Sequence, residues 1–252
     1  MSESLVLENV TVSRGAGPVI SDVSLRVTPG EVTALVGPNG AGKTSLIESI
    51  SGVIAHSAGR ILIGDEPIDR LSRVARARRG IVHIEQGRAV FGSLTVRENL
   101  SLTARTDAEA RAVLEQFPEL EKRWDAPTAL LSGGEQQMVV LARAFAAKPR
   151  FLLIDEMSLG LAPVVFTRLL PIVTALADAG AGVLLVEQFT NLALGRARDA
   201  LVVAGGRVTY QGDAAALREE PRLLHEAYLG RGGGGGAAGR VPPRPGGGRA
   251  GG

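Results

Sequence analysis

The sequence predicts an α/β fold with a mostly parallel core sheet, an N-terminal antiparallel β subdomain and an inserted helical subdomain. Residues 5–12 and 19–27 place apolar groups at nearly every second position, which indicates half-buried strands at the start of the chain. Short apolar runs then alternate with helical patterns, and buried strands that alternate with helices form a largely parallel sheet. From about residue 94 to residue 148 the patterns are helical only, so we place the helical subdomain there.

The strands and helices of the core follow one another in a regular order. The run 32–36 is continuously apolar, a glycine-rich loop follows it, and residues 45–50 are expected to form a helix. Further apolar runs predict strands at residues 61–63, 81–84, 151–154, 183–186 and 201–203. In the helical subdomain, where we expect Trp124 to pack, helices are predicted at residues 96–103, 108–117 and 135–147.

The composition indicates a folded protein. Of the 252 residues, 45% are apolar and 21% are charged, which suits one domain or two small ones with a sizeable core. The chain has no cysteine, so disulfides, thiolate metal sites, iron–sulfur clusters and a cysteine nucleophile are excluded. It opens without a signal sequence, and no apolar run approaches the roughly 18 residues of a membrane-spanning helix. We expect that the chain neither spans a membrane nor is exported.

The C-terminal residues 231–252 differ in composition from the rest. They hold four arginines, 11 glycines, three prolines and no acid, so the net charge of +2 becomes −2 without them. Such a segment cannot bury enough apolar surface to offset its ordering entropy, and we expect a disordered tail. The body is not a basic nucleic-acid binder, and no nucleic-acid partner is expected. Contact of the arginines with anionic lipid or RNA is the alternative function for the tail.

A glycine-rich loop between the strand 32–36 and the next helix predicts a phosphate site. The sequence GPNGAGKT matches the phosphate-loop pattern in the context of a strand, a loop and a helix. Backbone N–H groups and the helix N-terminus face a phosphate there, Lys43 reaches the β- and γ-phosphates, and the Thr44 hydroxyl is a ligand for Mg²⁺. A chance glycine turn is the alternative. The candidate nucleotide-binding residues are Gly37, Pro38, Asn39, Gly40, Ala41, Gly42, Lys43, Thr44 and Ser45.

An acid pair ends the apolar run that begins at Phe151. At the carboxyl end of a strand both Asp155 and Glu156 can reach a nucleotide crevice. Asp155 suits the Mg²⁺ shell, and Glu156 suits polarising the attacking water. Taken alone, an acid pair at this place is ordinarily a solvated turn, and the phosphate loop upstream favours the catalytic interpretation.

A second glycine-rich segment, LSGGE, precedes the predicted helix 135–147. Ser132 is a natural N-cap, and Gly133 and Gly134 expose N–H groups at the positive end of a helix before Glu135. The segment is therefore a candidate second anion site. Taken alone, it is more often a plain capped helix.

These motifs together resemble the nucleotide-binding subunit of an ATP-binding-cassette (ABC) transporter over about residues 4–230. GPNGAGKT, LSGGEQQM, FLLIDE and SLGLAP occur in the order that this family shows. The resemblance implies an ATPase that uses ATP and Mg²⁺. It also implies a dimer of two subunits arranged head to tail, in which LSGGE of one subunit closes over the ATP of the other, and docking on separate permease subunits in the membrane.

Further segments resemble the F-type ATPase of bacterial branched-chain amino-acid importers. They are GEQQM, SLGLAP, residues 86–100 and residues 186–188. The resemblance implies a dimer with a second cassette, which is a heterodimer in the F type, with a homodimer as the alternative. It also implies two permease subunits, an external solute-binding protein, and a cytoplasmic location on the inner face of the cell membrane. Gln86 falls at the position of the family residue that links Mg²⁺ to the permease.

Four positions depart from the family pattern. Arg14 stands where an aromatic residue usually stacks on adenine, and a guanidinium plane can also stack. Gln188 stands at the position of the switch histidine, so its amide is expected to orient the γ-phosphate and the water. Met157 replaces a proline, and Gln86 replaces the glutamate that is frequent in the F type.

Other functions and other roles stay open from the sequence alone. A related cassette could drive uptake of amides or urea, and a soluble ABC ATPase could remodel nucleic acid. A small-molecule phosphotransferase would leave LSGGE unexplained. Arg70, Arg73 and Arg76 share one helical face that we expect to be solvated, with permease or lipid contact as the alternative. His83 is expected to pack in the core.

Overall fold

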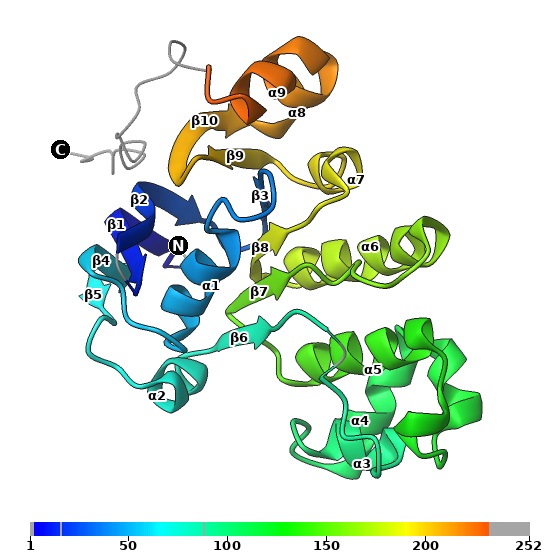
Figure 1. Cartoon of the computed structure of the whole chain (residues 1–252). Coiled ribbons are helices and arrows are strands. Elements are labelled where there is room, and N and C mark those ends of the chain that lie inside the picture. The colour runs from blue at the N-terminus through cyan, green and yellow to red at the C-terminus, as the bar shows by residue number, and fades with distance from the viewer. Residues whose placement is uncertain (1–2, 16, 88, 232–252) are drawn as a thin grey trace, which may run out of the picture.

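The computed structural model describes residues 3–15, 17–87 and 89–231, and it has two sheets (Figure 1). Most of the predicted tail, residues 232–252, lies outside the described residues. The first sheet is antiparallel, in the order β2-β1-β4-β5, and packs at the left of Figure 1. Its strands are β1 (Leu5–Arg14), β2 (Gly17–Val27), β4 (Ala58–Ile63) and β5 (Glu66–Pro67).

Strand β4 corrects one sequence expectation. We expected residues 61–63 in the parallel core sheet, but β4 pairs with β1 in antiparallel register, with Leu5 opposite Ile63. All three residues of the run are buried, because sheet and core cover both faces here. A continuous apolar run indicates burial of both faces, and it carries no information on the direction of pairing.

The second sheet has the predicted parallel core, in the order β10-β9-β3-β8-β7-β6. Only the β9–β10 pair is antiparallel among its described pairs. Every residue of β3, β7 and β8 is buried, which explains why these strands are continuously apolar. The strands are β3 (Val32–Val36), β6 (Ile81–Ile84), β7 (Phe151–Asp155), β8 (Gly182–Val186), β9 (Asp199–Ala204) and β10 (Arg207–Asp213).

Successive side chains of the core strands point into two different hydrophobic clusters. Leu35 and Leu153 pack toward helix α1 (Lys43–Ser51) and the antiparallel sheet, whereas Ala34 and Leu152 pack toward helix α6 (Pro163–Asp178) and the helical subdomain. Three short helices complete the core: α7 (Thr190–Leu194), α8 (Ala214–Glu219) and α9 (Pro221–Tyr228). The sheet is thus covered on both faces, and its carboxyl edge remains available for a ligand.

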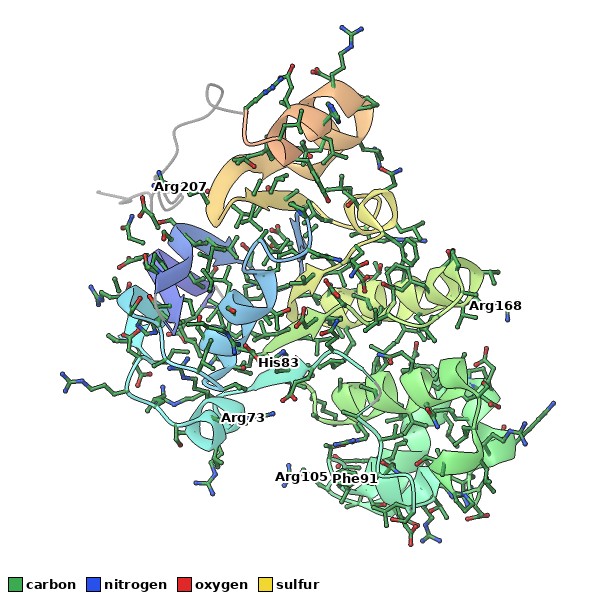
Figure 2. The ribbon with its side chains drawn as sticks, viewed as in Figure 1. Arg73, His83, Phe91, Arg105, Arg168 and Arg207 are labelled. Carbon is green, nitrogen blue, oxygen red and sulfur yellow. The ribbon has the colours of Figure 1, made fainter. Side chains whose placement is uncertain are left out.

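The helical subdomain is inserted between β6 and β7 and forms the green lobe of Figure 1. Phe91 and Arg105 lie in this lobe, well away from the antiparallel sheet (Figure 2). Trp124 packs in its core with 6% of its surface exposed, as expected. Its elements are α3 (Val96–Ser101), α4 (Asp107–Ala112), η1 (Val113–Glu115), η2 (Pro118–Arg123), η3 (Thr128–Leu130) and α5 (Gly133–Ala146).

Two helices of the lobe are shorter than the sequence predicts. The helix expected to reach residue 103 ends at Ser101, and the helix expected at 108–117 becomes α4 followed by the 3-10 turn η1. Pro118 supplies the reason in the second case, because the residue before a proline avoids helical dihedrals, and Phe117 has φ −133°. No helix among the described residues combines the length and apolar character that crossing a membrane requires.

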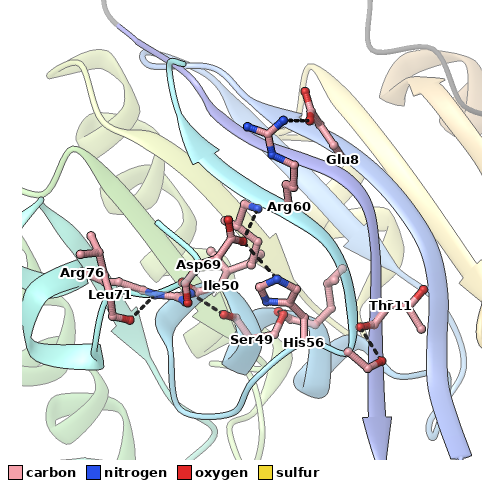
Figure 3. Close-up of polar contacts among 12 residues, drawn as sticks. Glu8, Thr11, Ser49, Ile50, His56, Arg60, Asp69, Leu71 and Arg76 are labelled. Atoms are coloured by element: carbon pink, nitrogen blue, oxygen red, sulfur yellow. Dashed lines mark hydrogen bonds and ion pairs between the residues drawn. The ribbon is translucent and has the colours of Figure 1, made fainter. Parts of the chain in front are cut away.

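Arg76 on α2 (Arg73–Arg78) corrects another expectation, since it is buried rather than solvated (Figure 3). Its guanidinium donates to the carbonyl oxygens of Ser49 and Ile50 at the end of α1, at 2.6 and 2.8 Å, and also to those of Leu71 and Asp69. These contacts satisfy carbonyl groups that a helix end leaves unpaired. Arg70 and Arg73 are exposed, as expected.

His83 lies on β6 beside α2, the helix that carries Arg73 (Figure 2). Its Nδ1 atom is 3.0 Å from the Ser51 hydroxyl oxygen, and burial lowers the pKa of the imidazole to about 4. The ring is therefore neutral at physiological pH and packs against the end of α1, as the sequence predicts.

Candidate functional site

A cavity of about 530 Å³ lies at the carboxyl edge of the parallel sheet. It joins the phosphate loop to the ends of β6, β7 and β8, which are distant in sequence. Parallel strands bring their carboxyl ends to one edge of a sheet, where such folds bind nucleotides. The cavity is lined by Val19, Asn39, Gly40, Gly42, Lys43, Thr44, Ser45, Gln86, Glu156, Leu159 and Gln188.

The phosphate loop takes a shape that glycine alone permits at two points. A Cβ atom on Gly37 would lie 2.1 Å from the carbonyl oxygen of Val203, and Gly42 has φ +96° at the N-cap of α1. No side chain caps this helix end. The first backbone N–H groups of α1 therefore keep their donors for a ligand in the cavity, where the helix dipole also favours an anion.

Lys43 is the buried cation of this site. Only 4% of its surface is exposed, and its Nζ donates to the carbonyl oxygens of Gly37 and Pro38 at 2.9 and 3.1 Å. Burial lowers the pKa of Lys43, and the carboxylates of Glu156 and Asp155 oppose that shift. The ammonium group thus lies at the base of the loop, within reach of any phosphate held there.

Glu156 is held by residues from three other elements. The amide nitrogens of Gln86 and Gln188 each lie 3.0 Å from its Oε2 atom, and Lys43 Nζ lies 3.8 Å from its Oε1 atom. Its backbone has φ +47°, an uncommon conformation for a residue with a side chain, and its N–H donates to Val186 O at 2.9 Å. Three predicted catalytic residues are therefore in direct contact around one carboxylate.

Asp155 fits the role of a magnesium ligand. Burial raises the pKa of Asp155 to about 6, against a hydrogen bond from the Thr44 hydroxyl. Its Oδ1 atom is buried and has no hydrogen-bond partner among the described residues. A buried carboxylate oxygen without a partner beside a threonine hydroxyl suits a hard cation that takes oxygen ligands. Thr44, Asp155 and Gln86 are the residues present that could hold Mg²⁺.

The LSGGE segment lies outside this cavity. Ser132 is exposed and is the N-cap of α5, where its hydroxyl accepts from Glu135 N while Glu135 Oε2 accepts from Ser132 N at 2.7 Å. Gly134 packs against Val165, whose Cγ1 atom would lie 2.8 Å from an added Cβ. None of the residues 132–135 lines the nucleotide cavity.

Arg14 also lies outside the cavity lining. Its Nε atom donates to the Ser45 hydroxyl at 2.9 Å, and its guanidinium pairs with Glu48 on α1. In this arrangement the guanidinium contacts the phosphate-loop helix rather than an open adenine site. Met157, the other departure in sequence, is buried in the core.

Two residues beside this site lie in segments that the sequence singled out, but no role at the site was predicted for either of them. Glu187 is completely buried, and Ser158 donates to it through both its backbone N–H, at 3.2 Å, and its hydroxyl. Burial raises the pKa of Glu187 to about 7, although the hydrogen bonds from Ser158 oppose the shift. The available signal was an acid that directly follows the apolar run 183–186.

The fold and the cavity define a P-loop ATPase of the cassette type. Residues 20–158 match the family model described as ABC transporter, and the chain belongs to this family as an ATP-binding ATPase subunit. It is 38% identical over 232 residues to the high-affinity branched-chain amino acid transport ATP-binding protein BraG of Pseudomonas aeruginosa, covering 90% of this chain and 99% of that one.

Two further proteins are similar over nearly the whole chain. The lipopolysaccharide export system ATP-binding protein LptB of Escherichia coli K12 is 34% identical over 237 residues, covering 90% of this chain and 97% of LptB. The solved ADP conformation of MJ1267, an ATP-binding cassette of an ABC transporter, has a TM-score of 0.79 at 25% identity, covering 91% of this chain and all of that one. The predicted fold class is thereby confirmed.

Proposed function

We propose that this chain hydrolyses ATP in the cavity described above, with Glu156 as the base. The contact of Gln86, Gln188 and Lys43 with one buried carboxylate beside the phosphate loop carries this assignment. These contacts fix the carboxylate of Glu156 at the edge of the cavity, where it can accept a proton from an attacking water.

Each residue of the cavity then has a separate task. The phosphate-loop N–H groups and Lys43 bind the β- and γ-phosphates of ATP, and a bound Mg²⁺ would supply further positive charge beside them. Thr44, Asp155 and Gln86 would hold this metal ion. Gln188 orients the water and the γ-phosphate through its amide, and Glu156 takes the proton as the water attacks.

The LSGGE segment acts in this proposal on a second cassette. Its helix end is exposed and lies apart from the cavity of its own chain, so a bound phosphate must come from a partner subunit. Two cassettes facing head to tail would place Ser132, Gly133, Gly134 and Glu135 over the partner's ATP. ATP binding closes such a dimer and hydrolysis reopens it, and each step biases the attached permease subunits between two states.

We infer that the transported solute is a branched-chain or other hydrophobic amino acid, taken up through separate permease subunits at the inner face of the membrane. The similarity to BraG at 38% identity supports this inference. The similarity to LptB is nearly as high, so a lipopolysaccharide carrier is the second candidate. The partner would be a second cassette, and the import system would include an external binding protein.

The test of the chemistry is Glu156→Gln, which keeps the volume and removes the base. ATP turnover should fall roughly 10²- to 10⁴-fold while ATP affinity stays unchanged, and an ATP-stabilised dimer should accumulate in gel filtration. Unchanged turnover together with a monomer in Mg-ATP would overturn the assignment.

The test of the solute is uptake of labelled leucine by cells that lack the chromosomal copy of the chain. Wild-type chain should restore uptake, and Glu156→Gln should not. Normal leucine uptake in the deletion strain, combined with a defect in the outer-membrane lipid, would favour the second candidate instead.

A further inference from the structure

The loop that follows the catalytic strand β7 turns sharply and has two opposite sides. Glu156 and Leu159 line the nucleotide cavity, whereas Met157 and Ser158 between them are buried on the other side. Glu156 adopts a left-handed φ of +47°, a strained conformation that persists only where surrounding contacts enforce it. The contacts that hold this loop therefore decide where the Glu156 carboxylate lies.

Three consecutive residues at the end of β8 supply those contacts. Val186 accepts the backbone N–H of Glu156 at 2.9 Å, and the Gln188 amide reaches Glu156 Oε2 at 3.0 Å. Glu187, between them, points to the opposite side and accepts both donors of Ser158. The segment 186–188 thus holds the loop from both sides, with the side chain of Glu187 behind it.

We propose that Glu187 is a positioning residue for ATP hydrolysis, which acts by fixing Ser158 and through it the place of the Glu156 carboxylate. Glu187 has no exposed surface, so it cannot touch the nucleotide. A fully buried carboxyl group needs hydrogen-bond partners, and here both partner groups belong to one residue of the catalytic loop. The inference rests on the proposed role of Glu156 as base.

The experiment compares Glu187→Ala, Glu187→Gln and Ser158→Ala in the full chain by steady-state hydrolysis of ATP. A displaced base slows the chemical step, and a misplacement of about 1 Å costs on the order of 100-fold in rate. We expect kcat to fall roughly 10- to 100-fold in Glu187→Ala and less in Glu187→Gln, whose amide oxygen keeps one acceptor. KM for ATP should stay within about twofold, because the phosphate loop is untouched.

Two controls separate positioning from loss of folded protein. The stoichiometry of a fluorescent ATP analogue gives the fraction of chains that bind nucleotide, and kcat is divided by it. Asp69→Asn is the matched substitution, because Asp69 also accepts a backbone N–H, from Ile61 at 2.8 Å, but lies beside the antiparallel sheet (Figure 3). Its kcat per bound nucleotide should equal that of the wild type.

A double-mutant cycle tests whether Glu187 and Ser158 act through one contact. If they do, Glu187→Ala with Ser158→Ala should be no slower than the slower single variant. Should Glu187→Ala fail to bind nucleotide, Glu187→Gln and Ser158→Ala decide the outcome. If kcat per bound nucleotide stays within twofold of wild type in these variants while Glu156→Gln is inactive, the positioning role is wrong and the proposed function stands. Unchanged turnover in Glu156→Gln overturns the proposed function itself.

Discussion

The phosphate loop and the LSGGE segment are two glycine-rich helix starts that the fold treats in opposite ways. The helix after the phosphate loop has a left-handed glycine at its N-cap and no capping side chain, and it begins inside a cavity. The helix after LSGGE is capped by its own Ser132 and Glu135 and begins at the surface. The N-terminus of α1 thus keeps its N–H donors for a ligand bound in the cavity of the same chain.

This difference indicates which part of a nucleotide site each segment can supply. A loop with a buried lysine and free N–H groups binds phosphate within one chain. A capped and exposed helix end has satisfied part of its own donors and needs a second molecule to bring the anion to it.

The largest expected effect is that of Lys43→Ala on nucleotide affinity. Hydrogen bonds from a charged donor contribute about 1.5 to 3 kcal/mol, so affinity for ATP should fall roughly 10- to 150-fold. Titration with a fluorescent ATP analogue measures the change. Affinity within twofold of wild type would show that the phosphates bind elsewhere.

Ser132→Arg should leave nucleotide binding by the single chain within about twofold, because Ser132 does not line the cavity. The bulky cation at the helix start should block closure of the dimer. ATP turnover should then fall on the order of 10-fold or more, because the nucleotide site lacks the groups that the partner's LSGGE segment supplies. Equal loss of monomer binding in this variant and in Lys43→Ala would contradict an action across the dimer.

Replacing one glycine of each segment with alanine should change the stability of the fold to different extents. A Cβ atom on Gly37 meets a backbone carbonyl oxygen at 2.1 Å at a φ of +153°, so Gly37→Ala should destabilise the fold by about 3 kcal/mol. At Gly134 the Cβ meets only the Val165 side chain, and a helix favours alanine by up to about 1 kcal/mol. Because the added Cβ would lie 2.8 Å from Val165 Cγ1, this side chain must shift, and Gly134→Ala should destabilise the fold by about 1 to 2 kcal/mol, less than Gly37→Ala. Thermal unfolding of both variants gives the comparison.

The motifs were predictable from sequence because their chemistry is local. A phosphate loop needs glycines and a lysine within eight consecutive positions, and the capping box needs a serine and a glutamate three residues apart. The buried strands were predictable for the same reason, since a strand buried on both faces is continuously apolar.

The remaining features depend on partners that are distant in sequence. Glu187 is paired with Ser158, 29 residues away, and the position of an acid at a strand end does not predict which residue donates a hydrogen bond to it. Arg76 shares a helical face with two exposed arginines. It is buried because the end of α1 packs against it and accepts its hydrogen bonds. The direction of β4 was set by its pairing with β1, which apolar content does not encode.

Glu187→Gln should also change the pH dependence of stability. Burial raises the pKa of Glu187 from 4.5 to about 7. The protonated Glu187 side chain therefore makes its full contribution to the free energy of unfolding below pH 4.5, and the wild type loses this contribution as the pH rises through 7. Glutamine does not titrate, so the free energy of unfolding of the variant should rise relative to that of the wild type by on the order of 2 to 3 kcal/mol between pH 4.5 and pH 7. Asp155 titrates in both proteins, so its contribution cancels in the difference of melting temperatures. A constant difference across this range would show that Glu187 does not titrate there.

The smallest expected effect is that of Ser132→Ala, which removes the cap that distinguishes LSGGE from the phosphate loop. Loss of an N-cap costs about 1 kcal/mol, or roughly 2 to 4 °C in melting temperature for a chain of this size. Thr95→Ala is the matched control, because Thr95 and Glu98 form the same capping box at the start of α3. Both variants should lose similar stability, since each removes one side-chain acceptor from an exposed helix end. Only Ser132→Ala should weaken the ATP-stabilised dimer in the Glu156→Gln background, because the Ser132 hydroxyl would then be missing at the partner's phosphate. Equal dimer populations in the two variants would mean that the serine of LSGGE serves its own helix alone, and that the backbone N–H groups of Gly133 and Gly134 bind the partner's ATP without it.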